Sequence, residues 1–304
     1  MSIIQAAMER LKGNRAAHQP PRATHSRPAR TDARVAAESA AAVVTASLPS
    51  PIVWPQNAGP VVEIDVARLA ERGLYAHAAF VGRQQEDYRV IRREVIAATR
   101  AKTTPEARAV GPVAVVTSAL AGEGKTYTAL NLALSIASEG VHDVLLVDAD
   151  TVRRSLTLAL DLDGVQGLLE LLRHPDRNFM DYALRTSIQR LRVLPAGLPF
   201  AGASDLFSFG RVGPLFAAMD SALNAHVAIV DTAPLLLSSD TPMLADSAGQ
   251  VLLVVRAGKT LQDSVRDAIR RIKESVPVGL VLNDWDPLLA SERQAYYGYE
   301  AYRK

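Results

Sequence analysis

The sequence predicts an α/β fold in which a mostly parallel sheet is flanked by helices on both faces. Short apolar runs, suited to buried strands, alternate along the chain with longer segments that repeat apolar residues at helical spacing. With 304 residues, of which 48% are hydrophobic, the chain can form one large domain with an appendage. Strands that alternate with helices predict βαβ units and parallel strand pairing.

Four segments are expected along the chain. Residues 1–12 predict a short amphipathic helix, which either docks on a partner or a membrane surface or remains a weakly ordered terminus. Residues 13–60 are rich in Ala, Pro and Arg without a sustained period, which predicts a disordered basic linker. Residues 61–290 form the predicted folded domain, and residues 291–304 a flexible tyrosine-rich tail.

The elements of the domain are expected in a regular order. Residues 61–74 predict a short strand and a helical turn, and residues 84–100 a helix with Tyr88, Ile91 and Val95 on one face. The remaining predicted strands comprise residues 113–116, 144–147, 191–194, 227–230, 251–255 and 278–282. The predicted helices between them comprise residues 125–138, 165–173, 213–224 and 261–275.

Composition excludes several classes of protein. The chain has no cysteine, which rules out disulfides, cysteine–zinc sites and cysteine nucleophiles. A net charge of +2 does not indicate a nucleic-acid-binding protein. The start of the chain does not resemble a signal peptide, and no apolar run reaches the length of about 18 residues that a membrane span needs. A cytoplasmic protein is therefore expected.

A phosphate-binding loop is predicted between the first core strand and the following helix. Residues 118–126 read SALAGEGKT. Gly122 and Gly124 allow the backbone to approach phosphate groups, Lys125 can reach the terminal phosphates, and the Thr126 hydroxyl can bind Mg²⁺. A structural turn is the alternative interpretation, but the strand–loop–helix context favours a P-loop NTPase-type fold that binds ATP with Mg²⁺.

Acidic side chains follow two of the predicted strands. Asp148 and Asp150 come at the end of the 144–147 strand, and Asp231 comes at the end of the 227–230 strand. Any one of them alone would be interpreted as a loop-capping aspartate. Because ligands of open α/β sheets bind at the carboxyl ends of the strands, the three together predict a magnesium-binding and catalytic edge beside the P-loop.

Several motifs together resemble one family, the bacterial tyrosine kinases. TSALAGEGKT, VLLVDAD and VDTAP are similar to its Walker A, Walker A′ and Walker B motifs, and VVRAGKT and GLVLN to its later strand ends. The nearest resemblance is to the tyrosine autokinases found with exosortase and PEP-CTERM exopolysaccharide loci, and it covers most of the chain outside the linker. The chain departs from the usual patterns at Ala119, where P-loops have glycine, at Ala121 and Ala233, where the family has proline, and at Arg153-Arg154, where it tends to have Arg-Pro.

The resemblance implies a division of roles for phosphoryl transfer, in which positioning and charge stabilisation supply most of the catalysis. Lys125 neutralises the β- and γ-phosphates, and Thr126 and Asp231 hold Mg²⁺. Asp148 accepts or orients the proton of the tyrosine hydroxyl and is also a candidate metal ligand, while Asp150 supports the metal shell.

The expected ATP contacts extend from the P-loop to the last strand. Asn283 is a candidate for the adenine edge, because an amide offers both a donor and an acceptor. The residues expected to bind ATP are Ala121, Gly122, Glu123, Gly124, Lys125, Thr126, Tyr127 and Asn283.

The tail carries half of the eight tyrosines of the chain. Tyr296, Tyr297, Tyr299 and Tyr302 lie within its last nine residues, with Gly298 among them. They are either an aromatic patch that packs on a neighbour or, as the resemblance implies, the acceptors of autophosphorylation.

Glu86, Arg89 and Arg92 match the family's E-x-x-R-x-x-R signature. Their spacing on a helix is compatible with a solvated face and a local ion pair. The resemblance instead implies a subunit interface of a homo-oligomeric ring, in which the tail of one copy enters the site of its neighbour.

The implied partners are further copies of the chain and a separate transmembrane chain-length regulator or activator. Such a partner would place the protein at the inner face of the membrane, where it would regulate exopolysaccharide biosynthesis. Two other functions remain open at this point. One is a ParA/MinD-like ATPase that positions cargo, although the lysine of its loop is replaced by Leu120 here. The other is a non-catalytic nucleotide-binding adaptor.

Overall fold

A computed structural model describes residues 61–75, 81–100, 111–208, 210–223 and 226–284. The chain divides into two units, residues 1–50 and 51–304, and every described residue belongs to the second. The helix expected at 1–12, the linker expected at 13–60 and the tail expected at 291–304 lie outside the described residues.

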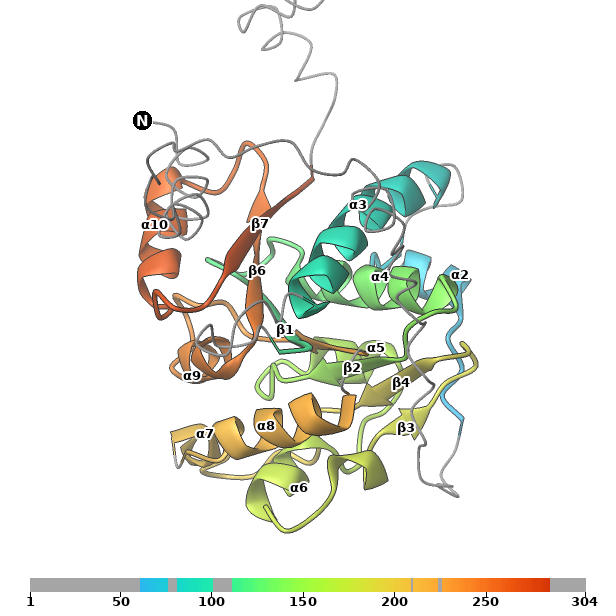
Figure 1. The fold of residues 1–304 in the computed structure, drawn as a ribbon, viewed down its shortest axis with the longest axis vertical. Coiled ribbons are helices and arrows are strands. Elements are labelled where there is room, and N and C mark those ends of the chain that lie inside the picture. Colours follow the sequence, from blue (N-terminus) through green and yellow to red (C-terminus); the bar gives the residue numbers. More distant parts are fainter. Residues whose placement is uncertain (1–60, 76–80, 101–110, 209, 224–225, 285–304) are drawn as a thin grey trace, which may run out of the picture. The chain divides into compact units, whose positions relative to one another are not determined.

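The described residues form a seven-stranded sheet with the strand order β3-β4-β2-β5-β1-β6-β7 (Figure 1). Every neighbouring pair is parallel except β3 and β4, which are antiparallel. The mostly parallel sheet therefore confirms the predicted fold class. The strands are β1 (Val113–Ser118), β2 (Val144–Asp148), β3 (Leu184–Arg185), β4 (Leu191–Leu194), β5 (Val227–Asp231), β6 (Gln250–Arg256) and β7 (Val278–Asn283).

Helices cover both faces of this sheet. In Figure 1, α3 and α4 lie on one side of β1 and α8 lies on the other. The helices are α2 (Val66–Glu71), α3 (Val81–Arg100), α4 (Lys125–Ser138), α5 (Ser155–Ala159), α6 (Leu168–Arg173), α7 (Asp205–Ser208), α8 (Val212–Leu223), α9 (Asp240–Ser247) and α10 (Gln262–Arg270), with a 3₁₀ turn at Phe179–Asp181.

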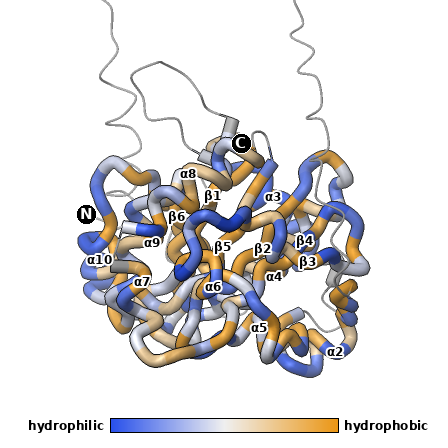
Figure 2. The backbone as a smooth tube through the Cα atoms, turned by 90° about the horizontal axis from the view of Figure 1, so that it is seen from below, coloured by the Kyte–Doolittle hydropathy of each residue, from blue (hydrophilic) through white to orange (hydrophobic). Residues whose placement is uncertain are grey.

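The centre of the sheet is apolar on both faces. Every residue of β1, β2 and β5 is buried, which explains why these strands read as continuous apolar runs rather than as alternating patterns. On one face, Val116 and Leu146 pack in a cluster with Leu130 and Ile136 of α4. Figure 2 shows these hydrophobic strands in the middle of the described chain, with hydrophilic stretches in the outer loops and helices. Truncating a core side chain such as Leu146→Ala would cost about 2–5 kcal/mol.

Parallel pairing aligns the ends of the central strands. Asp148 of β2 lies opposite Asp231 of β5, and Val116 of β1 lies opposite the same Asp231. The loop that joins β1 to α4 leaves the sheet at this same edge. The register therefore brings the predicted loop and the predicted acids together.

Several predicted elements differ in extent, most by one to three residues at an end. Residues 61–64 make a single bridge, from Val62 to Thr186, rather than a strand. The helix predicted from residue 165 begins at Leu168, because the Gly167 amide donates to Glu170 Oε2 at the helix start. The helix predicted over 261–275 comprises only Gln262–Arg270, and the chain then turns toward β7 at Val278.

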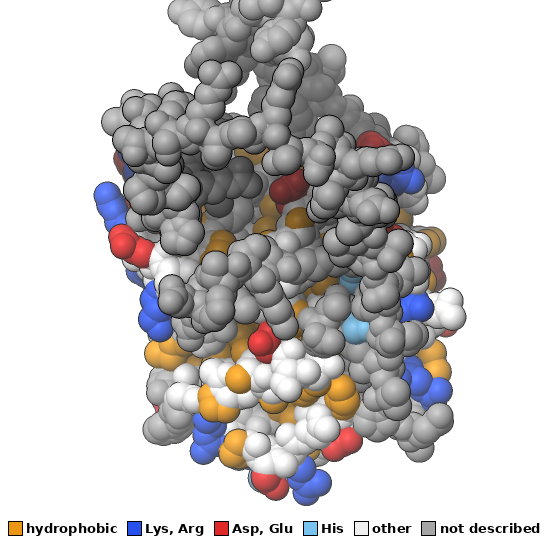
Figure 3. All heavy atoms as spheres, viewed as in Figure 1, with side chains coloured by type: hydrophobic (Ala, Val, Ile, Leu, Met, Phe, Trp, Pro, Cys, Tyr) orange, Lys and Arg blue, Asp and Glu red, His pale blue; other side chains and the backbone are white. Residues whose placement is uncertain are grey.

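The described surface carries no dominant charge in the view of Figure 3, where basic and acidic side chains are interspersed with hydrophobic and neutral ones. This agrees with the small net charge of +2. Within the described ranges, no helix combines the length and the apolarity that crossing a membrane requires.

Candidate active site

The loop between β1 and α4 has the conformation that its glycines allow. Gly122 and Gly124 have φ angles of 77° and 97°, in the left-handed region that favours glycine. Gly124 is the N-cap of α4 and supplies no side-chain cap, so the first amides of the helix remain available to an anion. A side chain at Gly124 would also collide with the Asn283 amide. The loop therefore has the shape expected of a phosphate cradle.

Lys125 lies at the start of α4 and is almost fully buried. Its Nζ is 3.5 Å from Asp150 Oδ2, and the two side chains are only 8% and 1% exposed. Asp150 Oδ1 accepts a hydrogen bond of 3.1 Å from the Arg153 amide. Among the described residues, Asp150 Oδ2 accepts no hydrogen bond, so its ion pair with Lys125 is its main compensation.

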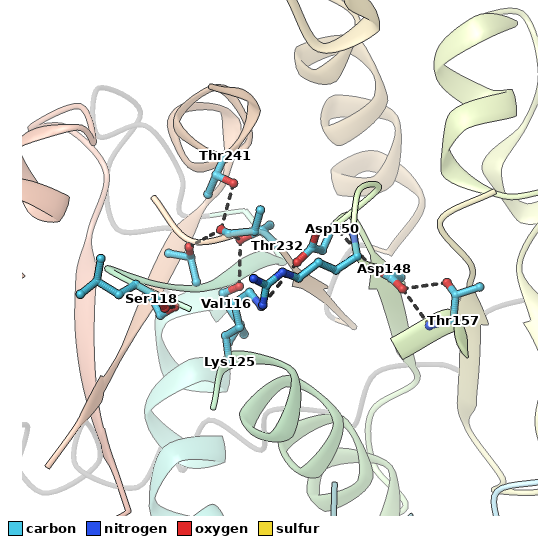
Figure 4. Close-up of polar contacts among 12 residues, drawn as sticks. Val116, Ser118, Lys125, Asp148, Asp150, Thr157, Thr232 and Thr241 are labelled. Carbon is cyan, nitrogen blue, oxygen red and sulfur yellow. Dashed lines mark hydrogen bonds and ion pairs between the residues drawn. The ribbon is translucent and has the colours of Figure 1, made fainter. Parts of the chain in front are cut away.

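Asp148 is held by three hydrogen bonds. Its Oδ2 accepts from the Thr157 amide at 2.8 Å and from the Thr157 hydroxyl at 2.7 Å, and its Oδ1 accepts from the Asp150 amide at 3.1 Å (Figure 4). Burial nevertheless raises the pKa of Asp148 to about 6, because the Thr157 hydrogen bonds offset only part of the desolvation and the Asp150 charge opposes ionisation. The carboxylate is thus fixed in orientation.

Asp231 has the least compensated carboxylate of the site. It is completely buried, and neither oxygen accepts a hydrogen bond of normal geometry from the described residues. Burial raises the pKa of Asp231 to about 8, against the opposing effects of the Lys125 charge and the nearby Thr126 hydroxyl. The Asp148 charge raises it further. Buried oxygens without protein partners are available to bind water, an ion or a ligand.

The loop after β5 is fixed by three threonine hydroxyls (Figure 4). Thr117, Thr232 and Thr241 all donate to the Ala233 carbonyl oxygen, over 3.0, 3.2 and 3.0 Å. Thr232 also donates to the Val116 carbonyl, over 3.1 Å. These contacts hold the backbone that follows Asp231.

The acids fit a magnesium ion that is only partly bound by protein. The described residues contain no cluster of three or more His, Cys, Asp or Glu side chains that could hold a metal ion. Mg²⁺ characteristically binds one or two carboxylates together with water and substrate phosphates. Asp231 has both oxygens without partners and Asp150 has one, whereas both oxygens of Asp148 already accept hydrogen bonds. The geometry therefore favours Asp231 over Asp148 as a metal ligand.

Two other predicted ATP contacts take positions that sequence reasoning did not anticipate. The half-buried Tyr127 side chain packs against the apolar cluster of α3 and α4, and burial, followed by the neighbouring Tyr75, raises its pKa. The backbone of Tyr127 lies in the first turn of α4, next to the loop. Asn283 Nδ2 donates to the Glu123 carbonyl oxygen over 2.9 Å, which places the amide directly against the P-loop. Ala121 and Gly122 are exposed, as a ligand-binding loop requires.

The three residues of the predicted interface do not share one environment. Arg89 Nη1 pairs with Glu86 Oε2 at 2.8 Å, and both side chains are exposed. Arg92 instead packs on α4, where it donates to the Ser135 carbonyl over 2.8 Å and lies 3.5 Å from Glu139. Arg92 therefore has a role within the chain, and the exposed Glu86–Arg89 pair is the part left for an interface. The predicted acceptors Tyr296, Tyr297, Tyr299 and Tyr302 lie outside the described residues.

Sequence reasoning missed two residues of the site, Thr157 and Thr260. The Thr157 hydroxyl bridges Asp148 and the Ala196 amide, and no motif marks it. The Thr260 hydroxyl donates to the Glu123 carboxylate. Thr260 belongs to the VVRAGKT segment, which was the one available signal.

Comparison with known proteins gives this site a family. No protein-family model matches the chain. The chain is 34% identical over 176 residues to a putative tyrosine-protein kinase, EpsB of Ralstonia nicotianae, covering 57% of this chain and 23% of that protein. It is 30% identical over 188 residues to the tyrosine-protein kinase YwqD of Bacillus subtilis, covering 60% of this chain and 76% of that protein.

A solved structure shows the same fold. The kinase domain of the Escherichia coli tyrosine kinase ETK superposes with a TM-score of 0.58 at 22% identity, covering 74% of this chain and 82% of that one. The chain spans only about a quarter of the length of EpsB but about three quarters of YwqD. Identity of 30% across most of YwqD, together with the P-loop and its acids, shows that this chain belongs to the bacterial tyrosine-protein kinase family.

Proposed function

We propose that the chain is an ATP- and Mg²⁺-dependent protein-tyrosine autokinase that phosphorylates its own C-terminal tyrosines. The observation that carries the proposal is the Asp231 carboxylate, which is completely buried beside a P-loop lysine and has no hydrogen-bond partner among the described residues. The Lys125 charge and the nearby Thr126 hydroxyl offset only part of its burial, and a buried acid in this state is typical of a functional site.

The residues divide the work of binding and transfer. The amides of the P-loop and the start of α4 bind the phosphates, and Lys125, now 3.5 Å from Asp150, neutralises their terminal charge. Asp231 holds the metal with Thr126, and Asp150 supports its water shell. When bound there, Mg²⁺ would supply positive charge that offsets the negative charge developing in transfer. Asn283 contributes to the adenine edge.

Asp148 orients the acceptor. A tyrosine hydroxyl has a pKa of about 10, so a carboxylate that accepts its proton during transfer assists the reaction. The pKa of Asp148, about 6, is nearer to neutrality than that of an ordinary aspartate, and its three hydrogen bonds fix its orientation. The acceptors proposed are Tyr296, Tyr297, Tyr299 and Tyr302.

The family supplies the setting of the proposal. We place the chain in a homo-oligomeric ring, with the exposed Glu86–Arg89 pair at the subunit contact. A separate transmembrane activator would hold it at the inner face of the membrane, where phosphorylation of the tail regulates exopolysaccharide synthesis or export.

The deciding experiment is incubation of the purified protein with Mg²⁺ and ATP beside a Lys125→Ala variant, followed by phosphosite mapping with mass spectrometry. Phosphotyrosine at residues 296–302 in the wild type alone would support the autokinase. Phosphate release without phosphotyrosine would contradict it and favour a cargo-positioning ATPase. ATP binding with neither product, repeated in the presence of the activator, would favour a non-catalytic adaptor.

A further inference from the structure

Glu123 is an acidic residue inside a loop that is shaped to bind anions. Its side chain is only 4% exposed. Glu123 Oε2 accepts a 2.7 Å hydrogen bond from the Leu120 amide, across the turn of the P-loop. Glu123 Oε1 accepts a hydrogen bond from the Thr260 hydroxyl. The carboxylate therefore bonds back to the loop and to a neighbouring strand end.

Thr260 is itself held in place by contacts other than the one with Glu123. Its hydroxyl oxygen accepts a 3.0 Å hydrogen bond from the Arg256 amide, in the turn that follows β6. Arg256 Nε is in turn 2.8 Å from Asp284 Oδ2, just after β7. The hydroxyl that holds Glu123 thus comes from a turn that is itself tied to the edge of the sheet.

Asn283 gives the same loop a second attachment. Its amide donates to the Glu123 carbonyl oxygen over 2.9 Å and occupies the space beside Gly124, where a side chain would not fit. Glu123 is therefore held through its carboxylate by Thr260 and through its backbone by Asn283. The two contacts come from the ends of β6 and β7, two strands on one side of the P-loop.

We propose that Thr260 and Asn283 are positioning residues that act through Glu123 to hold the P-loop open for phosphate. This extends the proposed function and rests on its nucleotide-binding part alone. A glycine-containing loop loses much conformational freedom when it is ordered, so prior fixing of the loop lowers the cost of binding. Released from Thr260, the Glu123 carboxylate would also be free to turn toward the phosphates and repel them.

The test uses Thr260→Val, which removes the hydroxyl at nearly constant volume. Two probes are titrated in the presence of Mg²⁺: ATP, and inorganic pyrophosphate, which has phosphates but no base. We expect Thr260→Val to lower the affinity for ATP and for pyrophosphate by about tenfold each, which corresponds to about 1.4 kcal/mol. Amide hydrogen exchange at residues 119–124 of the nucleotide-free protein should accelerate as well. Thr260→Ser, which keeps the hydroxyl, should restore both measurements.

Asn283→Ala separates this proposal from a contact with adenine. If Asn283 contacted only the adenine base, its loss would lower the affinity for ATP and leave the affinity for pyrophosphate unchanged. The proposal expects both probes to weaken. Thr99→Val is the matched control, because this buried hydroxyl donates to the Ile96 carbonyl within α3, away from the site. It should leave both affinities and the exchange of the loop unchanged.

The possible outcomes are distinct. Wild-type affinity and exchange in Thr260→Val, or failure of Thr260→Ser to restore them, would overturn the role of Thr260. Unchanged pyrophosphate binding in Asn283→Ala would overturn the role of Asn283. A wild-type protein that binds neither probe would contradict the nucleotide site itself, and this proposal with it.

Discussion

Buried aspartates lie at both ends of the central strands, but their hydrogen-bond and ion-pair partners differ between the two ends. At the amino-terminal edge, Asp143 precedes β2 and His226 precedes β5. Asp143 Oδ1 lies 3.3 Å from Arg190 Nη1, and the Asp143 amide donates to His226 Nδ1 over 2.8 Å. At the carboxyl-terminal edge, Asp231 is fully buried and accepts no hydrogen bond from the described residues.

The difference separates structural burial from functional burial. A buried acid with an arginine partner recovers part of its desolvation cost through the ion pair. A buried acid without a partner opposes the fold and is expected where a ligand completes it. The sequence places Asp231 at the carboxyl end of a strand, where ligands of such sheets bind, but it does not show which buried aspartates have partners.

The largest effect is expected for Asp231→Asn. The amide removes the anionic metal ligand, so phosphotyrosine formation should fall by about a hundredfold or more. The measurement is the initial rate of phosphotyrosine formation with saturating Mg²⁺ and ATP. A variant that retained wild-type activity would remove Asp231 from the metal site and undo the comparison.

Protonation of the Asp231 carboxylate should also make the free energy of unfolding depend on pH. The pKa of Asp231 is about 8 in the folded protein, far above the ordinary value of 3.8, so the folded state binds the proton more tightly. The nucleotide-free protein should therefore be stabilised at low pH and lose this stability as pH rises from about 4 to about 8. Asp148 adds a dependence of the same sign up to about pH 6. Urea unfolding across this range should show a flatter profile in Asp231→Asn than in the wild type.

Asp143→Asn, in contrast to Asp231→Asn, should lower stability and leave ATP binding unchanged. It removes the charge that faces the partly exposed Arg190 and weakens that contact, at a cost of about 1–3 kcal/mol in unfolding free energy. Affinity for ATP should not change, because the residue lies at the far edge of the sheet. Urea unfolding and ATP titration check the two halves of this prediction, and an altered ATP affinity would show that the edges are coupled.

Thr157→Val tests whether the orientation of Asp148 matters. The hydroxyl donates to Asp148 Oδ2 over 2.7 Å and accepts from the Ala196 amide over 2.9 Å. We expect kcat to fall about tenfold, as for the loss of one hydrogen bond to a charged group, with little change in KM for ATP. Thr157→Ser should recover the rate. A fall confined to KM would argue against a positioning role.

The smallest effects are expected on α3. Arg89→Ala removes an exposed pair three residues apart and should cost only about 0.2–0.5 kcal/mol. Arg92→Ala breaks a contact to the Ser135 carbonyl and should cost about 0.5–1.5 kcal/mol. Urea unfolding measures these costs, and sedimentation measures assembly. Weakened assembly in Arg89→Ala at unchanged stability would support a subunit contact at Glu86–Arg89.

Much of the fold follows from local sequence. The helix predicted at 125–138 and the strand predicted at 191–194 have those bounds in the structure, because each has a clear apolar pattern and a clear end signal. Two short helices, α5 and α7, the eight-residue α9 and the two-residue β3 were not predicted. Elements of two to eight residues span at most about two helical turns, so they show little periodicity and their positions depend on tertiary contacts.

The site was predictable in kind but not in detail. Glycines, lysine and acids at strand ends identify the P-loop and its edge. Local pattern does not show that Tyr127 turns into the core or that Arg92 bonds to α4, since both depend on how α3 packs on α4. It also cannot show that Asp148 is held while Asp231 is not, because that depends on where Thr157 lies after folding.

The ends of the described domain leave from opposite sides of the sheet. Val62 bridges to Thr186 beside β3, and Asp284 follows β7, the last strand at the other side. With about 4.8 Å between neighbouring strands, these two anchor points are roughly 30 Å apart. The chain before Val62 therefore joins the domain beside β3, and the chain after Asp284 joins it beside β7. Fluorophores attached at these two anchor points would report, through energy transfer between copies of the chain, which sides of two copies come together.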